Sequence, residues 1–161
     1  MNKGYFDGPL ITMYDAGASA VLGAPHWRVC VPFSYYVGGD PKRRVYVEAG
    51  YLTDGASVPR AAWSIIPPWG QYGQAAVVHD LLCEYLQISV DGVPTSITRA
   101  ECDSILLEAM QALAVPDLEA KTIYESVNLY RVVSGTEKPT NTARKRALEA
   151  QWHITLEQKS A

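Results

Sequence analysis

Two segments of helical length limit what this chain can fold into, because each carries one polar side chain on an otherwise apolar stripe. In residues 74–86, His79 lies on the apolar face defined by i, i+3, i+4 and i+7 spacing. In residues 98–113, Asp103 lies in the middle of the corresponding stripe. An Asp on a core-facing stripe is unfavourable unless it has a partner. Neighbouring antiparallel helices with a short connection would bring the two groups together, so we expect a buried His79–Asp103 pair.

The rest of both stripes consists of small and aliphatic side chains. The first stripe contains Ala75, Ala76, His79, Leu82, Cys83 and Leu86. The second contains Ala100, Asp103, Leu106, Leu107, Met110 and Leu113. On the first helix, Asp80 and Glu84 share an adjoining, more polar face, about 100° away. Thr98 and Glu101 have the spacing of a capping box, which predicts that the second helix begins at Thr98.

The first third of the chain is typical of strands. Short β-rich runs occupy residues 10–14, 27–31, 33–37 and 44–48. A Gly-Gly-Asp-Pro turn at 38–41 separates the last two runs, and together they indicate a small antiparallel sheet. Residues 90–94 predict a turn or small hairpin between the two helices. A third helix is expected to open at Pro116 and to end near Gly135, a C-cap signal.

These elements predict an α+β fold, in which a small N-terminal antiparallel sheet packs against three to four helices, with a C-terminal helix appended. Residues 1–135 form the expected single domain, and residues 136–161 a linker and a polar helix. Leu148, Trp152 and Leu156 lie on one stripe of that helix. Because such a segment is marginal alone, it should dock on its own domain or on a partner.

Composition excludes several classes of function. The net charge of −3 argues against a large electropositive surface and against nucleic-acid binding, and the basic runs at 42–44 and 144–146 indicate a solvated turn and helix face. Three cysteines make no disulfide framework and are interpreted as small buried hydrophobes in a reducing compartment. Neither a signal core nor a membrane-length apolar segment is present, so a virion or the host cytoplasm is the expected location.

A loop before the first long helix supplies further candidates. Asp54 is a candidate general base or metal ligand, and alternatively a turn residue. Ser57 is a candidate nucleophile beside His79, although the N-cap of a short helix through Trp63 is the simpler interpretation, and no Gly-x-Ser-x-Gly motif surrounds it. Asp80 and Arg60 are candidates for supporting the site from nearby.

A zinc site is a weaker alternative. His79, Cys83 and Asp103 are side chains of types that bind zinc. However, no Cys-x-x-Cys or His-Glu-x-x-His spacing is present, and His26 and His153 lie at a strand start and in the tail. We therefore expect neither a metal nor another cofactor.

Three stretches of the sequence, taken together, resemble a known family. They are Thr53-Asp54-Gly55-Ala56-Ser57-Val58-Pro59-Arg60, then Gly73-Gln74-Ala75-Ala76-Val77-Val78-His79-Asp80-Leu81-Leu82, then Arg99 with Cys102-Asp103. In this order they resemble domain-of-unknown-function family 1353, found mainly in bacteriophages and prophages, over roughly residues 25–135. The chain departs from that family where Leu81 follows His-Asp in place of a frequent aromatic, and where Cys102 replaces a more usual alanine. The resemblance implies a phage origin and highlights Asp54, His79, Asp80 and Asp103.

Two functions follow as hypotheses. The first is a bacteriophage structural or assembly component of the tail or baseplate, in which the His79–Asp103 pair clamps the core. Its partners would be other phage proteins, bound through a surface rich in tyrosine and tryptophan and through residues 141–161. The alternative is a small hydrolase acting on cell wall or another host polymer, with His79, Asp103, Asp54 and Ser57 as catalytic residues. A host-directed inhibitor is a third hypothesis without specific support in the sequence. The exposure of His79 and Asp54 discriminates the structural component from the hydrolase, because a hydrolase needs both residues to line an open cleft.

Overall fold

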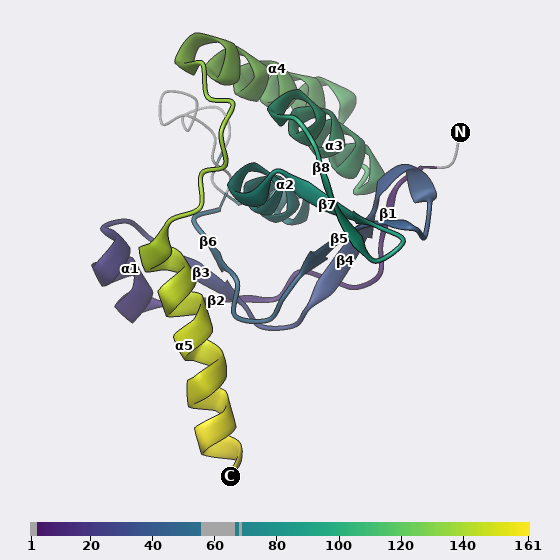
Figure 1. The fold of residues 1–161 in the computed structure, drawn as a ribbon. Helices are drawn as coiled ribbons and strands as arrows, with labels where there is room; N and C mark the ends of the chain where they lie inside the picture. Colours follow the sequence, from purple (N-terminus) through teal and green to yellow (C-terminus); the bar gives the residue numbers. More distant parts are fainter. Residues whose placement is uncertain (1–2, 56–66, 68) are drawn as a thin grey trace.

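The computed structural model describes residues 3–55, 67 and 69–161, and their arrangement confirms the predicted α+β fold (Figure 1). The strands are β1 (Tyr5–Phe6), β2 (Thr12–Tyr14), β3 (Trp27–Val29), β4 (Phe33–Tyr36), β5 (Arg43–Val47), β6 (Leu52–Thr53), β7 (Gln87–Val90) and β8 (Val93–Ser96). The helices are α1 (Ala16–Leu22), α2 (Gly73–Tyr85), α3 (Arg99–Ala112), α4 (Asp117–Ser134) and α5 (Ala143–Ser160), with a short 3-10 turn η1 (Val37–Gly39). The predicted helix at 57–63 lies outside the described residues.

The strands form two antiparallel sheets where the sequence predicted one. The larger sheet has the order β1-β4-β5-β7-β8, and the smaller has the order β2-β3-β6. The hairpin expected near residues 90–94 is present as β7–β8, and β7 pairs with β5 and so extends the N-terminal sheet. Asp91 and Gly92 both have positive φ at its turn, as a tight hairpin requires.

Helix α1 is an element that the sequence patterns did not predict. Asp15 caps its first turn by accepting a hydrogen bond from the backbone N–H of Ala18 at 2.8 Å, and Gly23 ends it with φ of 77°. The seven residues between these caps are too few to show a helical stripe of apolar residues. Both caps were visible in the sequence, but the periodicity that would have supported them was not.

Helix α2 lies at the centre of the molecule and positions the candidate site. It packs on α3 and on β5, and α3 in turn packs on α4 (Figure 1). Asp80 and Glu84, expected on a more polar face, are both buried. Ten of the thirteen residues of α2 are buried, so its polar groups need partners within the protein.

The chain that follows α4 returns to α2 rather than forming a free linker. The backbone N–H groups of Thr140 and Asn141 donate to the carbonyl oxygens of Cys83 and Glu84, at 3.1 and 3.3 Å. The Asn141 side chain donates to the Glu84 carbonyl as well, at 2.8 Å. Because the last carbonyls of a helix have no partner within the helix, these bonds complete the C-terminal end of α2.

Helix α5 docks on its own domain through residues 145–152 and projects away from it at its C-terminal end (Figure 1). The Arg28 guanidinium lies 4.9 Å from the centre of the Trp152 ring and donates to the Leu148 carbonyl at 3.2 Å. Lys145 forms an ion pair with Glu84, so the prediction that the 144–146 run is a solvated face is wrong for this residue. Its charge is needed there because Glu84 is a buried carboxylate. Leu156, the last residue of the predicted stripe, is exposed.

No helix among the described residues combines the length and apolar character needed to cross a membrane.

Candidate functional site

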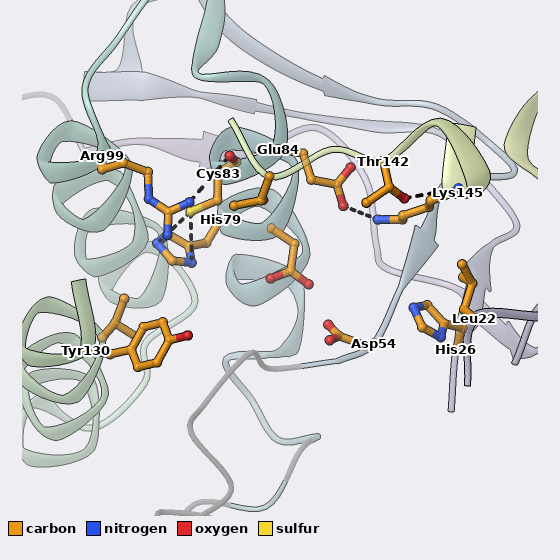
Figure 2. A pocket seen from close by; sticks show the side chains of 13 residues that line it. Leu22, His26, Asp54, His79, Cys83, Glu84, Arg99, Tyr130, Thr142 and Lys145 are labelled. Atoms are coloured by element: carbon orange, nitrogen blue, oxygen red, sulfur yellow. Dashed lines mark hydrogen bonds and ion pairs between the residues drawn. The ribbon is translucent and has the colours of Figure 1, made fainter. Parts of the chain in front are cut away.

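A pocket of about 370 Å³ lies between α2, α4 and the start of α5 (Figure 2). Its lining contains seven residues able to carry a charge: His26, Asp54, His79, Asp80, Glu84, Arg99 and Lys145. His79, Cys83 and Arg99 lie at one end of the pocket in Figure 2, and His26 and Lys145 at the other. The sequence candidates His79, Asp54, Asp80 and Cys83 are thus collected around one cavity.

The His79–Asp103 pair forms as predicted. His79 Nε2 donates to Asp103 Oδ1 at 2.8 Å, and the two residues are 6% and 1% exposed. The second oxygen of Asp103 accepts from Arg131 Nε of α4 at 2.9 Å. Asp103 lies behind His79 and does not line the pocket, so the three residues make a charged chain that ends at the pocket wall.

Electrostatics favour charge on all three members of this chain. Burial lowers the pKa of His79, but the bond to Asp103 and the contacts with Cys83 outweigh it and raise the pKa to about 9. Burial raises the pKa of Asp103, yet His79 and Arg131 together hold it below its usual value. At neutral pH the imidazole is therefore protonated and Asp103 is ionised.

The Cys83 side chain touches His79 but is a poor candidate for a thiolate. Its sulfur lies 3.5 Å from Nε2 and 3.9 Å from Nδ1 of His79. A hydrogen bond with Cys102 and burial both raise the pKa of the Cys83 thiol. No three His, Cys, Asp or Glu residues of the described chain are arranged to hold a metal ion.

Asp54 reaches the pocket through strand pairing. Strand β6 pairs with β3 in the register Trp27↔Thr53, so Asp54 follows the strand opposite His26, and both line the pocket. Thr53 donates to Asp80 Oδ2 at 3.1 Å and accepts from the backbone N–H of Gly55 at 3.2 Å. The backbone amide two positions after Asp54 belongs to residue 56, so the turn interpretation of Asp54 lies outside the described residues. Asp54 itself is exposed.

Ser57 and Arg60 lie outside the described residues, so the structure does not place the predicted nucleophile or the predicted supporting arginine.

Sequence reasoning missed His26, Glu84, Arg99 and Lys145 as pocket residues. Glu84 accepts from the Tyr51 hydroxyl at 3.2 Å and pairs with Lys145, whose ammonium group lies 4.4 Å from the centre of the Tyr51 ring. The sequence placed Glu84 on the more polar face of the first helix and Arg99 in a motif shared with the family, but it assigned neither residue to a site. His26 and Lys145 carried no local signal, because only the β3–β6 pairing and the return of the chain after α4 bring them to the site.

The fold and the site define a class: an α+β domain with a pocket built beside a buried His–Asp–Arg chain. Within it, the chain belongs to the family described as "Protein of unknown function (DUF1353)", which matches residues 27–127. The resemblance drawn from the three motifs is therefore confirmed.

One similar protein comes from a bacterium. It is "Uncharacterized protein y4jT" of Sinorhizobium fredii (strain NBRC 101917 / NGR234), which is 36% identical over 86 residues. The alignment covers 52% of this chain and 23% of that protein, so the chain spans only a small part of this relative's length. No solved structure matches the chain.

Proposed function

We propose that the pocket is an active site and that the protein is a hydrolase. The observation that supports this most is that the buried His79–Asp103–Arg131 chain ends in a pocket that also contains the exposed carboxylate of Asp54. A pair that only clamped two helices together would need no cavity beside its imidazole. A pocket with convergent titratable groups is instead typical of a catalytic site.

The charges suggest a role for each group. His79 is protonated at neutral pH, and Nδ1, the ring nitrogen not bonded to Asp103, contacts only the Cys83 sulfur among the described residues. His79 would therefore act as the general acid, and Asp103 as a positioning residue that fixes its ring. Asp54, at the exposed side of the pocket, would act as the general base.

The proposed reaction is the addition of water across a bond of the substrate. The water oxygen attacks the electrophilic carbon or phosphorus while its proton moves to the Asp54 carboxylate. The bond to the leaving group breaks, and the leaving group takes a proton from His79. The resemblance to a family found in phages supports a cell-wall polymer or another host polymer as the substrate.

Purified peptidoglycan is the first substrate to test. We expect the protein to release soluble fragments from it, measured as loss of turbidity and gain of new reducing ends or amines. Asp54→Asn should reduce the rate at least 100-fold, since general acid–base catalysis contributes roughly 10²–10⁴-fold. Asp91→Asn makes the same change at an exposed hairpin position away from the pocket and should leave the rate unchanged.

Two results would overturn the proposal. One is an Asp54→Asn variant as active as the native protein. The other is no hydrolysis of peptidoglycan or of a panel of chromogenic esters, glycosides and phosphodiesters.

We also propose, as a second function, that the protein is carried in a phage particle as a tail or baseplate component. The supporting observation is an apolar stripe on the outer face of α4, where Leu129, Val132 and Val133 are spaced i, i+3, i+4 and all three are well exposed. Monomeric proteins rarely expose such contiguous apolar surface. Mass spectrometry of purified particles should find the chain at a fixed copy number, and its absence from particles would overturn this second proposal.

A further inference from the structure

Arg99 is a buried cation that lacks a counterion in the described structure. It is the first residue of α3, is 7% exposed and lines the pocket. Its only hydrogen bond among the described residues is a long one, from Nη1 to the Cys83 carbonyl at 3.4 Å. Its Nε is buried with no partner, and no carboxylate of the described chain lies within ion-pair distance.

Both the burial and the position of Arg99 are unfavourable for the fold alone. A buried charge without a partner is strongly destabilising, whereas an apolar side chain of similar length is not. The first turn of a helix also carries the positive end of the helix dipole, which disfavours a cation there. The nearest acidic residue on the same turn, Glu101, is occupied by the cap, where it accepts from the backbone N–H and the hydroxyl of Thr98 at 2.7 and 2.8 Å.

The neighbours of Arg99 add positive charge rather than cancelling it. Cys83 contacts both Arg99, through its carbonyl, and His79, through its sulfur, so the two cations share this end of the pocket (Figure 2). The single carboxylate behind them, Asp103, is shared between His79 and Arg131. Three cationic side chains thus share this end of the pocket with one carboxylate, Asp103. The lining also contains Asp54, Asp80 and Glu84, and Glu84 is paired with Lys145.

We propose that Arg99 is the anchor for an oxyanion, a carboxylate or a phosphate, carried by the ligand of this pocket. A guanidinium offers a planar set of N–H donors that match such groups, and its unpartnered Nε leaves part of that set free. The N-terminal end of α3 favours an anion at the same place. The inference rests on the proposed function in that it assigns the substrate's anionic group, but the binding itself requires no hydrolysis.

The test uses inorganic phosphate and acetate as probes of the two oxyanions. Isothermal titration and thermal unfolding are followed in low-chloride buffer at constant ionic strength. We expect at least one of the two anions to bind and to raise the melting temperature of the native protein. Arg99→Met should weaken that binding at least tenfold and should melt at the same or a higher temperature, because it removes an uncompensated charge. Arg43→Met, the same change at an exposed site, should bind like the native protein.

The outcomes separate this inference from the hydrolase proposal. Binding that survives Arg99→Met, or no binding of either anion by the native protein, overturns the inference whether or not hydrolysis is observed. If Arg99→Met does not fold, Arg99→Lys decides: it keeps the charge but loses the planar donor set, and should bind several-fold more weakly. A lysine variant that binds as tightly as the native protein overturns the inference. Arg99-dependent binding without hydrolysis of any substrate supports the anion site and refutes the hydrolase.

Discussion

Replacing Asp103 with alanine tests the charged chain most directly. Asp103 is 1% exposed and accepts one bond from His79 at 2.8 Å and one from Arg131 at 2.9 Å. Without the carboxylate, His79 loses the hydrogen bond that raises its pKa most, and burial then favours its neutral form. The rise of the His79 pKa from 6.5 to about 9 corresponds to about 3 kcal/mol of stabilisation in the folded state. We therefore expect Asp103→Ala to lose up to about 3 kcal/mol through His79 at pH 6, or up to about 10 °C in melting temperature.

The pH dependence of this stability loss shows whether the Asp103 carboxylate keeps His79 protonated. Because the pKa of His79 is raised by folding, its contribution is complete below pH 6.5 and disappears as the pH rises through about 9. The pKa of Asp103 is lowered, so its own contribution disappears only as the pH falls below its usual range. The stability difference between the native protein and Asp103→Ala should thus be largest between pH 5 and 6.5 and shrink by pH 10.

Urea denaturation from pH 5 to pH 10 measures this difference. Asp117→Ala, at an exposed position in the first turn of α4, is the matched control and should show a small difference that does not vary with pH. A difference for Asp103→Ala that stayed constant from pH 6 to pH 10 would refute the claim that His79 is protonated by its carboxylate partner.

Three further predictions concern the docking of α5. Lys145→Met should destabilise the fold by about 2–3 kcal/mol in urea denaturation, because it leaves the Glu84 carboxylate buried without its cation; an unchanged midpoint would show that the pair contributes nothing. Gly50→Ala should increase cleavage of α5 in limited proteolysis, because Gly50 has a φ of 89° and an added methyl group would collide with the Trp152 ring; native-like protection would contradict this contact. Burial raises the pKa of Glu149 to about 7, Lys145 lowers it, and Glu84 raises it further. The contribution of Glu149 is therefore lost as pH rises towards 7, and Glu149→Gln should melt higher than the native protein at pH 8 but not at pH 4.5.

What the sequence predicted correctly depended on local periodicity. The helical spacing placed His79 and Asp103 on facing stripes, and the structure joins them in a 2.8 Å bond. The Thr98–Glu101 capping box also forms. Such patterns are read within one or two helical turns, and the β7–β8 hairpin that connects α2 to α3 is fixed by the pairing of β7 with β5.

What the sequence did not predict depended on contacts between distant segments. His26 reaches the pocket because β3 pairs with β6, and Lys145 reaches it because the chain turns back onto α2 after α4. Neither residue lies in a local pattern that differs from a solvated loop or helix face. Arg99 was visible in a motif, but only the structure shows that its guanidinium is buried without a counterion.

The bonds from Thr140 and Asn141 to the last carbonyls of α2 give the molecule a simple mechanical property. Helix α2, which carries His79, is held at its C-terminal end by residues 140–141, and this segment leads directly into α5. Cleaving the backbone at a single site in residues 136–139 would disconnect residues 140–141 from α4. Their hydrogen bonds to the end of α2 would then weaken, because the cut ends would no longer be held in place. The end of α2 beside Cys83 would then fray, and the wall of the cavity would loosen while the sheets and α3 stayed intact.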